Sequence, residues 1–320
     1  MPMIDRRLLL ACAAAIIAVP AVAQAPSELK IIAPAGPGGG WDTAARSIQQ
    51  VLTGAGLAKS VQVQNVTGAG GTVGLAQFIN GSKGDASQLI VNGITMVGAI
   101  LTNKAPVSLD QVTPLVRLTG DPLVIVVPEN SPHKTLKDVA AAIKADPSRF
   151  IWAGGSAGGA DHILAALATK AAGSDPGKLN YVAFSGGGEA LAAMLGGRVT
   201  AGVSGYGEFE SQIKAGKLRA IALSSGKRLE GVDVPTLKEL GMDVEVVNWR
   251  AVMAAPGISA QQRQELTAVF DKMVKSKEWT ELLKVRGWDD YYLAGEPFAA
   301  FLKEEQVRVA DVLRSIGLVK

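Results

Sequence analysis

Residues 29–42 read LKIIAPAGPGGGWD, an apolar run that ends in a glycine-rich turn, and a helical pattern follows from Thr43. Leu29–Ile32 is predicted to be a strand, because a short apolar run bounded by turn residues is typical of a buried strand. A strand, a tight turn and a helix in this order form the building unit of α/β sheets. This stretch therefore predicts an α/β fold.

The same unit recurs along the whole chain, so that strand patterns alternate with helical patterns and favour mostly parallel sheets. A β-rich segment in the first third and another in the last quarter would let the chain cross twice between two lobes. The predicted strands are Leu29–Ile32, Val61–Gln64, Leu89–Val91, Leu123–Val127, Phe150–Ala153, Tyr181–Phe184, Val199–Val203, Leu218–Ser224 and Val246–Ala254. The predicted helices include Asp161–Ala172, Glu189–Leu195, Ala260–Val274 and Pro297–Leu313.

The length of the chain indicates two domains, because about three hundred residues without an export signal exceed one ordinary hydrophobic core. The simplest topology has one lobe built from both ends of the chain and a second lobe inserted between them. We predict a signal peptide at residues 1–23, lobe 1 at 24–123 and 248–320, and lobe 2 at 124–247.

The N-terminus has the three regions of a secretory signal peptide. Arg6 and Arg7 supply positive charge, Leu8–Val19 is apolar but too short for a permanent membrane anchor, and Ala21-Val22-Ala23 supplies small residues. We predict general secretion, cleavage after Ala23 and a periplasmic location. The paired arginines match twin-arginine export only weakly. Cys12 lies in a lipoprotein-like box, but almost no hydrophobic segment precedes it.

The composition argues against several classes of protein. The formal charge is +3, the basic residues are scattered and aromatic residues are few, which does not indicate a nucleic-acid-binding surface. Cys12 is the only cysteine, so the mature chain has no disulfide. His133 and His162 are the only histidines and lack a clear set of carboxylate partners, so we expect neither a metal site nor a cofactor.

Five glycine-bearing loops follow predicted strands, at the sheet edge where α/β proteins bind ligands. Glycine lets the backbone approach a ligand closely, and amides at a helix N-terminus attract anions. None of these loops contains arginine or lysine, so we predict anion binding by main-chain amides. Ser204 and Tyr206 end another strand and are expected to close the cleft. The candidate ligand-binding residues are Gly36, Gly38, Gly39, Gly40, Trp41, Thr67, Gly68, Gly70, Gly71, Asn92, Thr95, Ser156, Ala157, Gly158, Gly159, Asp161, Ser185, Gly186, Gly187, Ser204 and Tyr206.

Two of these loops also resemble enzyme motifs. Gly154–Gly158 fits the G-x-S-x-G elbow of α/β-hydrolases, with Ser156 as nucleophile, but the later histidine of that fold is missing. Gly68–Gly74 resembles a dinucleotide-binding turn, but no acidic residue ends the following strand. A secreted hydrolase or dehydrogenase is therefore the alternative, and we expect a protein without catalytic residues.

The loops together resemble the substrate-binding receptors of tripartite tricarboxylate transporters, also called the Bug family. The motifs are Pro34-x-Gly-Pro-Gly-Gly-Gly-Trp-Asp42 with Arg46, Thr67-Gly-Ala-Gly-Gly71, Gly154-Gly-Ser-Ala-Gly-Gly-Ala-Asp-His162, Phe184-Ser-Gly-Gly-Gly-Glu189 and Gly216-Lys-Leu-Arg219. The resemblance covers the mature chain, and Trp41 looks like the tricarboxylate-binding branch.

This resemblance implies a type II periplasmic binding protein, or Venus flytrap, with a small tri- or dicarboxylate in the cleft between its lobes. It also implies two partners, a large and a small integral membrane subunit driven by an ion gradient. We expect a monomer. The sequence does not distinguish a receptor for import from a sensor. It does not identify the ligand either, because aromatic carboxylates or amino acids would present the same anionic group.

Individual side chains in these loops have several expected roles. Asp42 and Asp161 would repel a carboxylate, so helix capping is the favoured role for both. Trp41 either forms a cleft wall or packs under its loop. Arg250 is expected to be a buried ion-pair partner. Glu189 and Glu208 begin helices and are expected to pair with helix dipoles.

Overall fold

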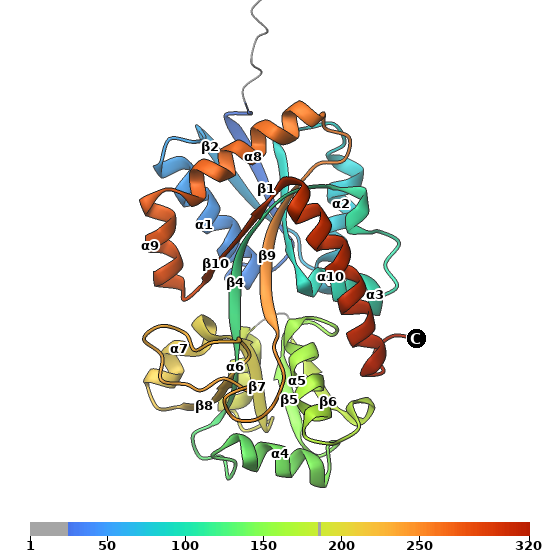
Figure 1. The fold of residues 1–320 in the computed structure, drawn as a ribbon, viewed down its shortest axis with the longest axis vertical. Coiled ribbons are helices and arrows are strands. Elements are labelled where there is room, and N and C mark those ends of the chain that lie inside the picture. Colours follow the sequence, from blue (N-terminus) through green and yellow to red (C-terminus); the bar gives the residue numbers. More distant parts are fainter. Residues whose placement is uncertain (1–24, 185–186) are drawn as a thin grey trace, which may run out of the picture.

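The computed structural model describes residues 25–184 and 187–320. The predicted signal peptide at 1–23, together with Ser185 and Gly186, lies outside the described residues. Figure 1 shows two lobes, one above the other, joined by two long strands. The protein has a two-lobe α/β fold, as the sequence predicts.

Lobe 1 contains both ends of the described chain. Its parallel strands lie in the order β2, β1, β3, with β9 (Val247–Ala254) next to β3. The strands are β1 (Glu28–Ala33), β2 (Ser60–Asn65), β3 (Gln88–Gly93) and β10 (Asp289–Ala294). The helices are α1 (Gly40–Gly54), η1 (Ala69–Gly71), α2 (Thr72–Gly81), α3 (Ile94–Thr102), η2 (Leu109–Gln111), α8 (Ala260–Val274), α9 (Lys277–Arg286) and α10 (Gly295–Ser315).

Lobe 2 is formed by the middle of the chain, in which β5 lies parallel to β6 on one side and to β7 on the other. Its strands are β5 (Ile151–Gly154), β6 (Asn180–Ala183), β7 (Ala201–Gly205) and β8 (Leu218–Leu223). Its helices are α4 (Leu136–Ala145), α5 (Ala160–Ala171), η3 (Pro176–Lys178), α6 (Gly187–Leu195) and α7 (Tyr206–Lys214).

Two antiparallel strands connect the lobes. They are β4 (Thr113–Pro128) and β9 (Val247–Ala254), which are paired from Thr113 with Ala254 to Pro122 with Val247. The first half of β4 also pairs with β10 in lobe 1, and its second half pairs with β7 and β8 in lobe 2. The sheets are therefore mixed, and the prediction of mostly parallel sheets is wrong in this respect. The physical reason is that the chain leaves lobe 1 along β4 and returns along β9, so the two run in opposite directions.

The sequence prediction also placed the start of β4 too late, at Leu123. Residues 113–122 include two prolines, a glycine and an aspartate, which resemble a turn. The strand tolerates them because its register shifts between Pro114 and Val116 and again between Arg117 and Thr119. The short strand β10 and the helix α9 were not predicted at all.

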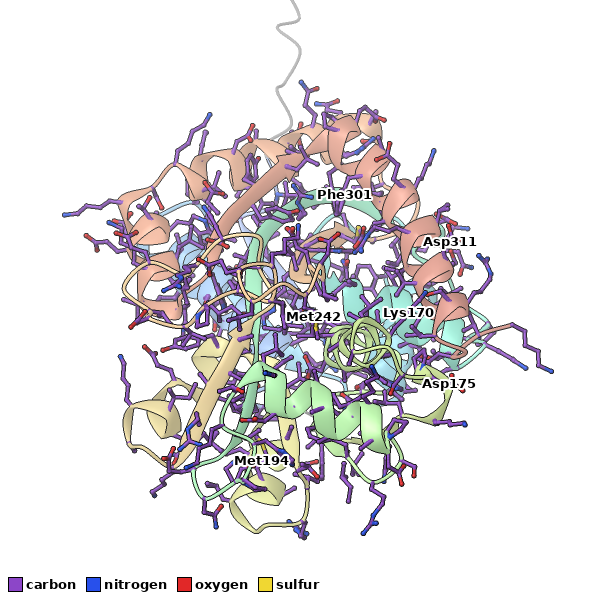
Figure 2. All side chains as sticks on the ribbon, turned by 60° about the horizontal axis from the view of Figure 1, so that its bottom comes forward. Lys170, Asp175, Met194, Met242, Phe301 and Asp311 are labelled. Carbon is purple, nitrogen blue, oxygen red and sulfur yellow. The ribbon has the colours of Figure 1, made fainter. Side chains whose placement is uncertain are left out.

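Packing fills the space around the crossing strands. Figure 2, turned so that lobe 2 comes forward, shows Met194 in lobe 2 and Phe301 in lobe 1. Met194 is buried between α6 and Gly202 of β7. Phe301 of α10 contacts Trp249 of β9, with ring centroids 5.5 Å apart. Among the described residues, no helix combines the length and apolarity that crossing a membrane requires.

Candidate functional site

A cavity of about 590 Å³ lies between the lobes, at the ends of the parallel strands. This volume lies within the range of sites that enclose small organic ligands. Many of the residues predicted from sequence to bind ligand line it, and they come from both lobes. These are Gly36, Gly39, Gly40, Trp41, Thr67, Gly68, Gly70, Gly71, Thr95, Ser156, Ala157, Gly159, Asp161, Gly187 and Ser204.

Four predicted residues do not line the cavity. Asn92 is fully buried inside β3, between β1 and β9, and Tyr206 is buried in the lobe 2 core. Gly38 turns its amide away from the cavity, toward the carboxylate of Asp42. Gly158 packs against Thr102 of α3, in the other lobe. These positions shape the strands and loops around the cavity, and their contact with a ligand stays a prediction. Ser185 and Gly186 lie outside the described residues.

Five of the helices that begin at the cavity lack a side-chain cap from their N-cap residue. The N-cap residues of α1, α2, α3, α5 and α7 are glycines, and none of them forms a side-chain cap. Away from the cavity, by contrast, hydroxyls of Thr135, Ser259 and Ser276 cap α4, α8 and α9. An uncapped first turn leaves amide donors for an anion. Around the cavity, therefore, no N-cap side chain accepts a hydrogen bond from the first-turn amides of these five helices.

Asp42 holds the first glycine loop in shape. Its carboxylate accepts hydrogen bonds from the Gly38 amide at 2.8 Å, Arg46 Nε at 2.9 Å and Asn65 Nδ2 at 2.8 Å. Burial acts to raise the pKa of Asp42, but the bonds from Arg46, Gly38 and Asn65 outweigh it and lower the pKa. Asp42 does not line the cavity. Its role is to fix the loop rather than to contact a ligand.

The corresponding loop of lobe 2 is held by the first turn of α5. Asp161 accepts the Gly155 amide at 2.7 Å, and the Tyr181 hydroxyl donates to the Gly155 carbonyl at 2.9 Å. His162 stacks on Tyr181, with ring centroids 4.1 Å apart, and its Nδ1 accepts the Gly158 amide at 3.1 Å. Burial lowers the pKa of His162 to about 4, which keeps the ring neutral. Its Nδ1 is thus engaged in shaping the loop and is not a free base for Ser156.

The two lobes touch directly beside the cavity. Thr95 of α3 accepts the Ala160 amide at 3.3 Å, and a Cβ atom on Gly98 would overlap the carbonyl oxygen of Gly158. A Cβ on Gly70 would stand 3.7 Å from that of Ser156. Glycines therefore permit the close approach of lobe 1 to lobe 2.

The crossing strands contribute a buried ion pair. Arg250 of β9 donates from Nη2 to Asp121 Oδ2 of β4 at 2.7 Å, and the two side chains are 5% and 4% exposed. Arg250 also lines the cavity, and Gly40 leaves space for it, because a Cβ there would lie 2.7 Å from Nη2. The prediction of a buried ion-pair partner is confirmed.

Residues 44–318 match the family described as tripartite tricarboxylate transporter family receptor. This chain belongs to that family. It is 30% identical over 296 residues to protein BugT of Bordetella pertussis strain Tohama I, covering 90% of this chain and 89% of BugT.

Solved structures agree with this assignment. The receptor resembles a TctC solute-binding protein from Polaromonas, at 26% identity and a TM-score of 0.68, over 90% of this chain and 98% of that one. It shares its fold with MatC from Rhodopseudomonas palustris with bound malate, at 24% identity and a TM-score of 0.76, over 89% and 98% of the two chains. Members of this family are periplasmic solute-binding receptors.

Sequence reasoning missed several residues that line the receptor's cavity. They are Pro34, Ala35, Ala69, Asn103, Gly155, Ala160, Ala183, Phe184, Glu189, Glu208, Asn248 and Arg250. Asn248 and Arg250 alternate along β9, so the two-residue period of a strand places both on one face. Once β9 is recognised as a strand that crosses between the lobes, this alternation predicts that Asn248 and Arg250 both face the cavity. The sequence predicts that Glu208 pairs with a helix dipole and that Tyr206 closes the cleft. In the structure, Glu208 lines the cavity and Tyr206 does not.

Asp161→Asn should change how the stability of this receptor depends on pH. Burial, followed by the nearby charges of Glu208 and Asp121, raises the pKa of Asp161 to about 7, against a bond from Gly155 that lowers it. A folded-state pKa above the unfolded value gives stability that is present below pH 4 and lost as the pH rises through 7. We expect the variant to melt roughly 2 to 6 °C above the wild type at pH 8, because its free energy of unfolding should be about 1–2 kcal/mol higher. At pH 4 the two proteins should differ little.

Thermal melts of both proteins between pH 4 and pH 8 check this expectation. Asp243→Asn, on an exposed residue outside the cavity, is the matched control and should follow the wild type. A difference between Asp161→Asn and wild type that stays constant with pH would contradict the assignment.

Proposed function

We propose that this receptor serves a tripartite tricarboxylate-type transporter by holding a small di- or tricarboxylate through the backbone amides of its glycine loops. The observation that supports this most is the set of uncapped, glycine-initiated helices around a 590 Å³ cavity. Such amides bind anions without a positively charged side chain. The malate in the fold neighbour MatC supports a carboxylate ligand of this size.

The proposed cycle needs export, closure and delivery. Cleavage after Ala23 would release the mature receptor into the periplasm. Ligand bridging the glycine loops would hold the two lobes together, with bending in β4 and β9 as the hinge. The closed receptor would then deliver its ligand to a large and a small integral membrane subunit. Trp41, which lines the cavity and also packs against Gly71, would form one wall for the carbon chain of the ligand.

The enzymatic alternatives receive less support. A hydrolase would need a base for Ser156, but the nearest histidine, His162, is buried and engaged with the Gly158 amide. In a dehydrogenase, Gly68–Gly74 would hold a dinucleotide, but no acidic residue ends the strand that follows, β3. The family assignment points to transport in both cases.

A carboxylate that bridges the lobes should stabilise the receptor against heat. Ligand at one hundred times its dissociation constant adds about 2.7 kcal/mol when it binds only the folded protein. For a chain of this size we expect the melting temperature to rise by roughly 5 to 10 °C. The measurement is a thermal-shift screen of di- and tricarboxylic acids on the mature protein, freed of co-purified ligand by unfolding and refolding.

Small-angle scattering of any stabilised complex tests closure separately. A smaller radius of gyration than that of the ligand-free receptor is expected. Stabilisation at an unchanged radius would refute the clamp but not the binding site. A response to nicotinamide nucleotides or esters, and to no carboxylate, would refute the proposed function.

A further inference from the structure

One residue of the crossing strand β9 faces away from the cavity, toward α10. Asn248 and Arg250 line the cavity, and side chains alternate along a strand, so Trp249 between them lies on the opposite face. Trp249 is 1% exposed, and its indole Nε1 donates to Glu305 Oε1 of α10 at 2.9 Å. The helix α10, which lies beside β9 in Figure 1, therefore bonds to the residue between two that line the cavity.

Glu305 interrupts the apolar face of α10. The other buried residues of this helix are apolar and follow helical spacing; they are Phe298, Leu302, Val309, Ala310 and Leu313. Glu305 lies among them and is 5% exposed, and a buried carboxylate costs stability unless it is paired. Arg308 balances its charge with two hydrogen bonds of 2.6 Å. An apolar residue would serve packing alone, so the bond to Trp249 is what the carboxylate adds at this position.

The crossing segment of β9 has little other support at Trp249. β3 pairs with β9 only as far as Gly93 with Arg250, so that ladder ends before Trp249. From Trp249 to Val247, β4 is the strand that pairs with β9 in the described part of the chain. The main chain of Trp249 also lies tightly against Gly93, because a Cβ there would overlap the Trp249 carbonyl oxygen. Trp249 is therefore held by its carbonyl against Gly93 and by its indole on Glu305.

We infer that Glu305 is a positioning residue of the cavity: its bond to Trp249 sets where β9 presents Asn248 and Arg250 to a ligand. A displaced indole would move both neighbours, because the three residues share one stretch of backbone. Side chains that contact a ligand have to be held within about 0.5 Å of their productive positions. The inference rests on the proposed function for its ligand, whereas the positions of Asn248 and Arg250 are observable without one.

Two substitutions separate the bond of Glu305 from its charge. Glu305→Gln keeps an oxygen that accepts from the indole, and Glu305→Leu completes the apolar face but removes the acceptor. Calorimetric titration of the refolded mature receptor would use L-malate, succinate and citrate as probes. For each probe that binds the wild type, we expect Glu305→Leu to weaken binding by about 5- to 10-fold, the equivalent of one hydrogen bond. Glu305→Gln should change it by less than about twofold, because the acceptor remains.

Two further variants test whether the effect passes through Trp249. Trp249→Phe removes the donor, so it should weaken binding as Glu305→Leu does. The double variant should bind no more weakly than either single variant, because both substitutions remove the same bond. Glu304→Leu is the matched control, since Glu304 is an exposed neighbour on α10, and it should leave affinity unchanged.

Crystal structures of the ligand-free wild type, Glu305→Gln and Glu305→Leu test the positions directly. We expect Asn248 and Arg250 to shift by more than about 0.5 Å in Glu305→Leu alone. Unmoved residues in Glu305→Leu would overturn the inference. An equal loss of affinity in Glu305→Gln would also overturn it, because the charge would then matter rather than the bond. If none of the three probes binds the wild type, the proposed function fails for these acids, and the three structures alone decide the inference.

Discussion

Gly98→Ala should weaken carboxylate binding roughly 10- to 100-fold while leaving the ligand-free receptor folded. Gly98 lies on α3 of lobe 1, and a methyl group there would overlap the Gly158 carbonyl of lobe 2. Overpacking of this kind costs about 1–3 kcal/mol wherever the lobes touch at this point, as they do in this structure, and an open ligand-free state would escape that cost. Alanine is otherwise favoured over glycine within a helix by up to about 1 kcal/mol. Affinity and stability should therefore change in opposite directions.

Calorimetric titration and thermal melting of the same preparation check this result. Gly81→Ala is the matched control, because Gly81 ends α2 and a Cβ there would meet nothing within 4 Å. It should leave affinity unchanged. Equal affinity of Gly98→Ala and wild type would show that the lobes do not need this contact when ligand is bound.

The loops were predictable from sequence because their signal is local. A strand, several glycines and a helix start within about ten residues suffice to place a loop at the edge of an α/β sheet. Gly36, Thr67 and Ser156, for example, line the cavity as predicted from this pattern. Local sequence does not show the direction in which each residue points, so Gly38 and Tyr206 were placed in the cavity wrongly.

The floor of the cavity was less predictable, because it depends on pairing between distant segments. Thr119 is paired with Arg250 and Asp121 with Asn248, so the whole lobe 2 sequence separates the members of each pair. The register that brings these polar residues together passes through two register shifts, which sequence patterns do not indicate. The first part of β4 resembles a turn in sequence because it contains proline and glycine. The strand tolerates these residues where it bends between the lobes.

Arg250→Met should destabilise the receptor by about 3–5 kcal/mol at pH 8, the usual loss when one partner of a buried ion pair is removed. Even beside Arg250, burial raises the pKa of Asp121 to about 6, with Glu208 contributing and Arg250 opposing. Without the arginine this pKa must rise further. Because a raised folded-state pKa gives stability at low pH that is lost as pH rises, the damage should be smaller at pH 5 than at pH 8.

The decisive comparison is with the double variant Asp121→Asn/Arg250→Met. It has no charge left in this buried pair, so it should recover most of the lost stability at pH 8. It should also lose the extra pH dependence of Arg250→Met and keep only the part due to Asp161. Urea unfolding of the wild type, the single variant and the double variant at both pH values measures this directly. If the double variant were as unstable as Arg250→Met, the cost would come from lost packing of Arg250 against Trp288, 5.0 Å away, rather than from the unpaired carboxylate.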